Sequence, residues 1–223
     1  MKKKKTKKKI KLKSILIILL IIVIIFLIIL WYTSLKITNI YVLGNHLLSE
    51  QEIIEMANLD DYPKVYKVLK SEIEKKLLDN DLVKKVHVSK SLLGKITIEI
   101  EESTILLKLN NGYYLTDMNK EIQYDNIYGI PSLINDCHEV QEKLVKKMVL
   151  INEDILKHIS EIEYKPNDLD KERFLLYMND GNFVYITLSK IDLINSYNEI
   201  YPTLDGKKGI LYLDSGNHFE IKK

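Results

Sequence analysis

Hydrophobic residues follow three different spacings along the chain, and each spacing predicts a different kind of element. Residues 15 to 30 are an unbroken run of Ile, Leu, Val and Phe, followed by Trp31 and Tyr32. As a helix this stretch extends roughly 27 Å, close to the hydrocarbon thickness of a bilayer. The two aromatic rings suit the membrane interface. The pattern predicts a transmembrane helix over residues 15–32.

The alternative for this segment is a cleaved signal peptide. A signal peptide has an apolar region of about 7 to 15 residues that ends in small residues. Here the run is longer and ends in "WYTSLK", so an uncleaved anchor is favoured. Nine lysines among the first thirteen residues predict a basic cytoplasmic tail over residues 1–14, with everything after Tyr32 outside the cytoplasm.

The anchor changes the meaning of the net charge. The chain carries +2 overall, but without the nine lysines of the tail the remainder has 24 Lys and Arg against 31 Asp and Glu, a net charge of −7. Topogenic charge and attraction to anionic lipid account for the tail. The lipid bilayer is therefore an expected partner, and nucleic acid is not.

A strand and a capped helix follow the anchor. In "ITNIYVLG", Ile40 and Val42 share one strand face, and the Gly-Asn pair at 44–45 tolerates the positive φ of a turn. Ser49 with Glu52 three residues later makes a capping box. This segment predicts a strand, a tight turn and a helix.

Helical spacing continues and then gives way to alternation. A second helix is predicted from Val65 to Leu78, and its apolar face is expected to hold Tyr66, Leu69, Ile73 and Leu77. Two strands follow, joined by a hairpin over residues 90–94, and their alternating apolar positions are Val86, Val88, Ile96, Ile98 and Ile100. The order is β-α-α-β-β, with both helices expected on one side of the sheet.

After Glu102 the chain turns to short strands with a few helices. "TILLKL", "GYYLTD" and "EIQYD" are predicted strands, and "GIPSLI" is an extended stretch. A helix is expected over residues 139–158. "HISEIEY", "ERFLLYM" and "NFVYITL" are further strands, then a helical segment leads to Pro202, and "GILYLDSG" is the last predicted strand.

These residues resemble the FtsQ/DivIB family of bacterial cell-division proteins. The opening "I..I.V.GN..LS..EI" and "NDLVKKVHVSKSLLGKITIEIEE" are similar to that family's POTRA domain, and "YYLTDMNKEI", "IPSLI" and "GILYLD" to its β domain. The chain departs from the family at Asp81, where a Pro is usual, near Leu93, where the hairpin usually holds another Pro, and at Tyr212, where an Asp is usual. The resemblance implies an α+β fold: residues 36–103 a POTRA domain, and residues 104–223 a mixed α/β domain with a mostly antiparallel sheet.

The sequence offers no catalytic constellation. The five histidines are dispersed, the glycines form no phosphate-binding loop, and Cys137 beside His138 has poor geometry for a nucleophile and its base. No catalytic, metal-binding or cofactor-binding residue is assigned, no small-molecule substrate is expected, and a lone Cys137 excludes an intramolecular disulfide. The chemistry favours binding over catalysis.

The resemblance implies a non-enzymatic scaffold at the division septum. Its partners would be small single-span coiled-coil proteins of the FtsB or DivIC kind, and FtsL. Strand addition at an exposed sheet edge is the expected route. "GILYLDSG" is taken as that edge, and the expected partner-binding residues are Leu211, Tyr212, Leu213, Ser215, Gly216 and Phe219. The alternatives are a POTRA-type polypeptide-binding protein of secretion or envelope assembly, and a membrane-anchored envelope enzyme.

Overall fold

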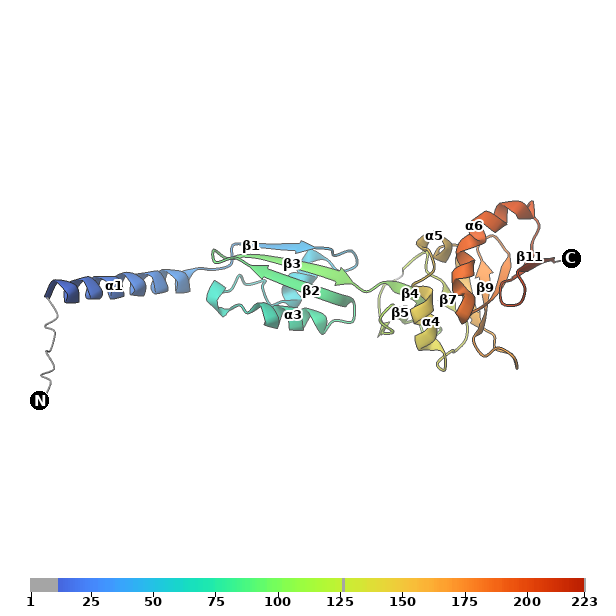
Figure 1. The fold of residues 1–223 in the computed structure, drawn as a ribbon, viewed down its shortest axis with the longest axis horizontal. Coiled ribbons are helices and arrows are strands. Elements are labelled where there is room, and N and C mark those ends of the chain that lie inside the picture. Colours follow the sequence, from blue (N-terminus) through green and yellow to red (C-terminus); the bar gives the residue numbers. More distant parts are fainter. Residues whose placement is uncertain (1–11, 126, 223) are drawn as a thin grey trace, which may run out of the picture. The chain divides into compact units, whose positions relative to one another are not determined.

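A computed structural model describes residues 12–125 and 127–222, which form two compact units (Figure 1). The first holds the residues up to Asn80 together with Lys85–Glu101, and the second holds Asp81–Lys84 and the residues from Glu102 onward. Most of the basic tail expected over residues 1–14 lies outside the described residues.

Helix α1 (Leu12–Ser34) contains the segment predicted to cross the membrane. It extends a few residues beyond 15–32 at each end. At its C-terminal end, the hydroxyls of Thr33 and Ser34 donate hydrogen bonds to the carbonyls of Leu30 and Trp31. Residues 13–34 are long and apolar enough to span a bilayer, and no part of this stretch is buried against the rest of the chain.

The rest of the first unit has the predicted β-α-α-β-β order. Its elements are β1 (Asn39–Leu43), α2 (Glu50–Met56), the 3-10 turn η1 (Val65–Lys67), α3 (Lys70–Leu78), β2 (Val83–Lys90) and β3 (Lys95–Glu102). The strand order is β1-β3-β2, and β1 runs parallel to β3, with Asn39 opposite Lys95. The crossover through two helices is what allows β1 and β3 to be parallel neighbours.

Local sequence signals account for most of this unit. The Ser49 side chain accepts a hydrogen bond from the Glu52 amide and the Glu52 carboxylate accepts one from the Ser49 amide, which confirms the capping box. Ile96, Ile98 and Ile100 are buried as the alternation predicted, while Lys95 and Glu99 on the opposite face are exposed.

The helix predicted over residues 65–78 is wrong in its first turn. Residues 65–67 form a 3-10 turn and α3 begins at Lys70, so that Tyr66 and Leu69 are exposed and Val65 and Val68 are buried instead. The ammonium of Lys90 donates to the carbonyls of Val65 and Val68. In a continuous helix these carbonyls would accept hydrogen bonds from backbone amides one turn further along. Here they accept from the Lys90 side chain instead, and the first helical turn does not form.

The second unit is built on one nine-stranded sheet. Its strands are β4 (Ile105–Lys108), β5 (Tyr114–Thr116), β6 (Glu121–Ile122), β7 (Ser132–Leu133), β8 (Ile159–Tyr164), β9 (Arg173–Met178), β10 (Phe183–Thr187), β11 (Gly209–Tyr212) and β12 (His218–Ile221). The order is β12-β11-β10-β9-β8-β7-β4-β5-β6. Three neighbouring pairs are parallel and the others antiparallel, which confirms a mostly antiparallel sheet.

Helices supply the other half of this core. They are α4 (Gln141–Met148), α5 (Glu153–Leu156), the 3-10 segment η2 (Leu188–Ser196), α6 (Tyr197–Ile200) and the 3-10 turn η3 (Tyr201–Leu204). Leu144 and Met148 from α4 and Ile191 and Ile194 from η2 are buried in one cluster with Phe174 of the sheet. The expected helix before Pro202 is thus mostly 3-10 in form, and Pro202 lies within η3.

The single helix predicted over residues 139–158 is two helices, α4 and α5, separated by a break. Asn195 holds the break, because its side-chain oxygen accepts from the Asn152 amide and its side-chain nitrogen donates to the Leu150 carbonyl. Apolar burial continues across the break, since Ile151 and Ile155 are buried along with Leu144 and Met148.

Cys137 is part of the same core and 1% exposed. Burial, with a smaller contribution from the neighbouring Asp136 carboxylate, raises the pKa of its thiol to about 11. The thiol therefore stays protonated at neutral pH and packs as a small apolar side chain.

Candidate partner-binding site

The sheet of the second unit ends at β12, not at β11 as the sequence suggested. β11 lies between β10 and β12, whereas among the described residues β12 is hydrogen-bonded only to β11. The chain reverses between the two strands through Gly216 and Asn217, both of which have positive φ. The expectation that "GILYLDSG" forms the edge is wrong because this turn brings a further strand alongside it.

The register shows which backbone groups β12 presents at its free side. The Lys222 amide donates to the Lys208 carbonyl, and Ile210 and Tyr212 are opposite Glu220 and His218. Hydrogen-bonded pairs alternate with non-bonded pairs along antiparallel strands. The amides and carbonyls of Phe219 and Ile221 therefore point away from β11, toward the free edge.

Gly209 makes this pairing possible. A Cβ atom at that position would lie 2.1 Å from the Glu220 carbonyl oxygen and 2.8 Å from the Phe219 ring. The Gly209 amide donates to the side-chain oxygen of Asn182, which is 1% exposed and also donates to the Tyr197 hydroxyl. A buried amide side chain thus takes the place of a backbone partner at the start of β11.

The six expected partner-binding residues divide between the interior and the surface. Leu211 and Leu213 are 4% and 3% exposed and belong to the core, and the half-buried Phe219 packs against that core opposite Leu211. Tyr212 lies on the outer face of the sheet, and Ser215 and Gly216 are in the exposed turn before β12. Their binding role remains a prediction, and the core positions of Leu211 and Leu213 leave no room for a partner on their side chains.

Replacing Leu213 with lysine is expected to destabilise the second unit. The site is buried among apolar side chains, so an ammonium there costs about 3 kcal/mol or more. Urea unfolding measures this, with Leu169→Lys as the matched control at a side chain that is 99% exposed, expected to change stability by less than about 0.5 kcal/mol. A Leu213→Lys protein as stable as the control would show that Leu213 is not in the core.

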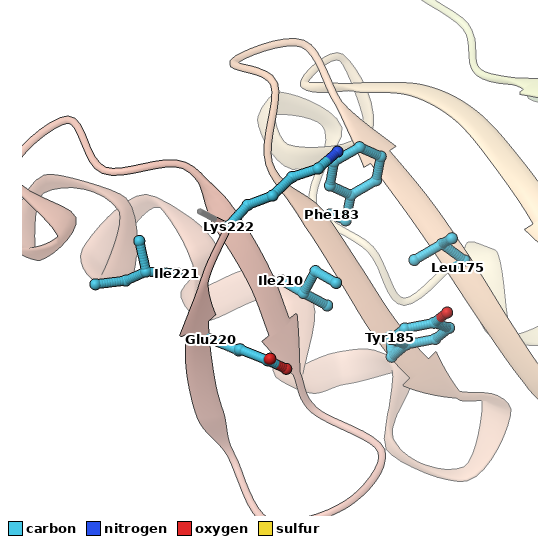
Figure 2. A pocket seen from close by; sticks show the side chains of 7 residues that line it. All are labelled: Leu175, Phe183, Tyr185, Ile210, Glu220, Ile221 and Lys222. Atoms are coloured by element: carbon cyan, nitrogen blue, oxygen red, sulfur yellow. The ribbon is translucent and has the colours of Figure 1, made fainter.

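An open groove of about 560 Å³ lies on the outer face of the sheet beside the free edge (Figure 2). It is lined by Leu175, Phe183, Tyr185, Ile210, Glu220, Ile221 and Lys222. The ammonium of Lys222 lies over the Phe183 ring, 5.0 Å from its centroid, at one end of the groove. Glu220 places a carboxylate on the opposite side of Ile210, and Ile221 points away from the other side chains (Figure 2).

Stacked side chains cross four strands on this outer face. The guanidinium of Arg173 lies 3.6 Å from the ring centroid of Tyr185, Tyr185 stacks on Tyr212 at 5.4 Å, and Tyr212 stacks on His218 at 4.7 Å. Burial, together with the hydrogen bond to Glu220, raises the pKa of Tyr212. The row gives this face flat, rigid apolar surfaces with polar tips, which is a composition typical of protein interfaces.

Arg173 is also half of an ion pair beneath the β11–β12 turn. Its Nε lies 2.6 Å from Oδ2 of Asp214, and the two side chains are only 16% and 9% exposed. Burial alone would raise the pKa of Asp214, but hydrogen bonds from Arg173 and Ser215 outweigh that effect and lower it. The ammonium of Lys190 donates to the Asp214 carbonyl, so this residue ties the turn to β9 and η2.

Asp214→Asn is expected to lower the stability of the second unit by about 3 kcal/mol at neutral pH, because it leaves the Arg173 charge buried without its partner. The folded-state pKa of Asp214 is depressed below the unfolded value, so the pair's stabilisation is present above pH 4 and is lost as pH falls through the folded pKa. Asp214→Asn should therefore flatten the loss of stability below pH 4.

Urea unfolding between pH 3 and 7 measures both effects. Glu153→Gln, which removes one half of the exposed pair with Lys157, is the control and should cost about 0.5 kcal/mol or less. Equal losses for the two variants would mean that the Arg173–Asp214 pair is no more stabilising than a surface pair.

Sequence reasoning missed the groove and named only Tyr212 of the row, because it placed the site on the last predicted strand and assigned the other strands to the core. The signal was present in "ERFLLYM" and "NFVYITL", where Leu175, Phe183 and Tyr185 fall at the outward positions of the alternation. Within the part of the chain that the structure describes, no group of three or more His, Cys, Asp or Glu side chains is placed to hold a metal ion.

An apolar helix of membrane-spanning length, a β-α-α-β-β unit and a mostly antiparallel sheet with a free terminal edge define a membrane-anchored POTRA protein. The POTRA domain of the FtsQ type matches residues 35–103. The chain is 32% identical to the cell division protein DivIB of Bacillus subtilis, over 83% of this chain and 74% of that protein. It is 30% identical to DivIB of Listeria monocytogenes, over 83% and 72%.

The chain therefore belongs to the FtsQ/DivIB family of bacterial cell-division proteins. Among solved structures, the major extracytoplasmic domain of DivIB from Geobacillus stearothermophilus aligns with a TM-score of 0.40 and 21% identity, covering 47% of this chain and 96% of that one. The family and the apolar helix found among the described residues make this a membrane protein with a role in cell division.

Proposed function

We propose that this protein is a scaffold of the division machinery that recruits single-span coiled-coil partners of the FtsB or DivIC kind, and FtsL, to the septum. It acts by binding and catalyses no reaction. The lysine-rich tail stays in the cytoplasm and both folded units lie on the other side of the membrane, an orientation that the lysine distribution supports.

The free edge of β12 is the observation that carries this proposal. Phe219 and Ile221 each direct one amide and one carbonyl away from β11, so an incoming strand finds two donors and two acceptors already aligned. Main-chain pairing of this kind supplies affinity, and pockets for alternate side chains supply specificity. An unpaired edge strand is otherwise a site of unwanted association.

The groove beside the edge gives the partner a second point of attachment. A strand added to β12 places every second side chain on the outer face of the sheet, next to the apolar floor formed by Ile210, Leu175 and Tyr185 (Figure 2). Lys222 and Glu220 flank that floor with opposite charges. The proposed partner segment therefore alternates apolar or aromatic residues toward the groove with polar residues away from it.

Photo-crosslinking in dividing cells tests the proposal. A photoreactive side chain at Ile221, in the full chain at native expression level, is expected to give an adduct with a small single-span division protein at midcell. The control places the same side chain at Leu169, which is 99% exposed in a loop of the same unit, where no such adduct is expected. Adducts of equal yield at both positions, or at neither, would contradict binding at the β12 edge.

A further inference from the structure

Three backbone hydrogen bonds hold two loops of the first unit against the segment that leaves α1. The Leu35 carbonyl accepts from the Val65 amide at 2.9 Å, the Ile37 amide donates to the Pro63 carbonyl at 3.0 Å, and the Thr38 amide donates to the Gly94 carbonyl at 3.0 Å. Thr38 is four positions beyond Ser34, the last residue of α1, a reach of at most about 14 Å. The β2–β3 hairpin therefore lies close to the end of the apolar helix.

Gly94 makes this approach possible. Its φ is +90°, and a Cβ there would lie 2.5 Å from the Lys36 carbonyl oxygen. The hairpin is also fixed internally, because the Ser91 hydroxyl accepts from the amides of Leu93 and Lys95. The tip is thus a preformed turn whose position next to the anchor is set by contacts.

That tip carries two adjacent leucines whose side chains are largely exposed. Leu92 is 76% exposed and Leu93 66% exposed, which is more than the apolar side chains of α1, at 46–59%. A single exposed leucine on a protein surface is ordinary. Two neighbouring leucines at a fixed turn, beside a helix of membrane-spanning length, instead lie close enough to the bilayer to contact its apolar region.

The charges around the tip have one sign. In the three segments joined by these hydrogen bonds, residues 35–38, 62–68 and 90–95, every charged residue is a lysine: Lys36, Lys64, Lys67, Lys90 and Lys95. The nearest acidic residues in sequence are Asp60 and Asp61, before Tyr62. This contrasts with the net negative charge of the chain beyond its basic tail and matches a surface of anionic lipid headgroups.

We propose that the Leu92–Leu93 tip inserts into the bilayer interface on the side where α1 ends, with the exposed lysines around it (Lys36, Lys64, Lys67 and Lys95) on anionic headgroups. The occupant is the lipid surface itself, and the inference rests on α1 crossing the bilayer. The first unit is then attached to the membrane at two points, the helix and the tip, so its rotation about the anchor is restricted. Apolar burial and lysine–headgroup attraction together are the usual combination for interfacial binding.

Depth-dependent quenching on the full chain tests this. The chain carries Cys137→Ala and one new cysteine labelled with an environment-sensitive fluorophore, and is placed in nanodiscs of phosphatidylglycerol and phosphatidylcholine, with or without brominated acyl chains. With the label at Leu93→Cys, emission is expected to shift to the blue and to be quenched at least about twofold more than at the control position. The shift should weaken in nanodiscs of phosphatidylcholine alone, because the lysines then lose their anionic partners.

The control label is at His46→Cys. His46 is exposed in the turn after β1, and Gly44 of that turn packs against Ile100 of β3. Ile100 is five residues along β3 from Lys95 at the hairpin, so this turn is roughly 16 Å from the tip. A label at Val23→Cys within α1 reports whether the anchor itself spans the bilayer. Strong quenching at 23 with equal, weak quenching at 93 and 46 would overturn the proposal while leaving the anchor intact. Absent quenching at 23 would overturn it together with the anchor on which it rests.

Discussion

Gly209→Val is expected to detach β12 from the sheet and to lower partner affinity at least about 100-fold, while the rest of the second unit stays folded. The added Cβ would lie 2.1 Å from the Glu220 carbonyl oxygen and 3.0 Å from the Glu220 carbonyl carbon, both backbone atoms of β12. Backbone atoms that are paired in a sheet cannot relieve a clash by changing a side-chain rotamer, so β12 must move. Overpacking of this kind costs about 1–3 kcal/mol, and β12, as the terminal strand, is the element that can leave.

The readout is residue-resolved amide exchange. The Lys222 amide, which donates to Lys208 in the wild type, should exchange rapidly in Gly209→Val, whereas the amides of β9 and β10 should stay protected. Ile210→Val at the next position, where a Cβ is already present, is the control and should leave Lys222 protected. Unchanged protection of Lys222 in Gly209→Val would mean that β12 is not held against β11 as described.

Ile221→Pro is expected to weaken partner binding about 10- to 100-fold without unfolding the protein, because the partner carbonyl that paired with the Ile221 amide loses its donor, at a cost of about 1–3 kcal/mol. The amide of Ile221 points away from β11, so proline removes no hydrogen bond of the fold, and proline is tolerated in an edge strand at such positions. The Ile221 side chain is 52% exposed, so little packing is lost.

Ile221→Ala separates the two contributions of this residue. Alanine removes the side chain and retains the amide, so it should bind within a few fold of wild type if the main chain supplies the affinity. Isothermal titration of the partner's extracytoplasmic segment against full-length protein in nanodiscs measures all three. Equal affinities for the proline and alanine variants would argue against main-chain pairing at this edge.

Strand alternation and helix caps were readable from the sequence because they depend on neighbours within a few residues. The capping box at Ser49 and the alternation over Ile96 to Ile100 are of this kind. The helix starts at Lys70 and Glu153 were not readable, because the bonds that set them come from Lys90 and Asn195, which are far away in sequence.

The free edge of the sheet was predicted one strand too early, at β11 instead of β12. Leu211 and Tyr212 follow the strand pattern, so "GILYLDSG" was found. "HFEI" is a short strand in which only Phe219 is half-buried and no residue is fully buried, and it follows a turn built from Gly216 and Asn217. A four-residue edge strand has too few residues for alternation to stand out. Only the register with β11 shows that Phe219 and Ile221 carry the free backbone groups.

The most direct test of the central claim is amide exchange at Phe219 and Ile221 in full-length protein, with and without the extracytoplasmic segment of the single-span partner. Strand addition at β12 predicts that both amides exchange freely alone and become protected on binding, while those of His218 and Glu220 are protected in both states. A partner that binds while Phe219 and Ile221 continue to exchange as in the free protein would contradict recruitment through this edge.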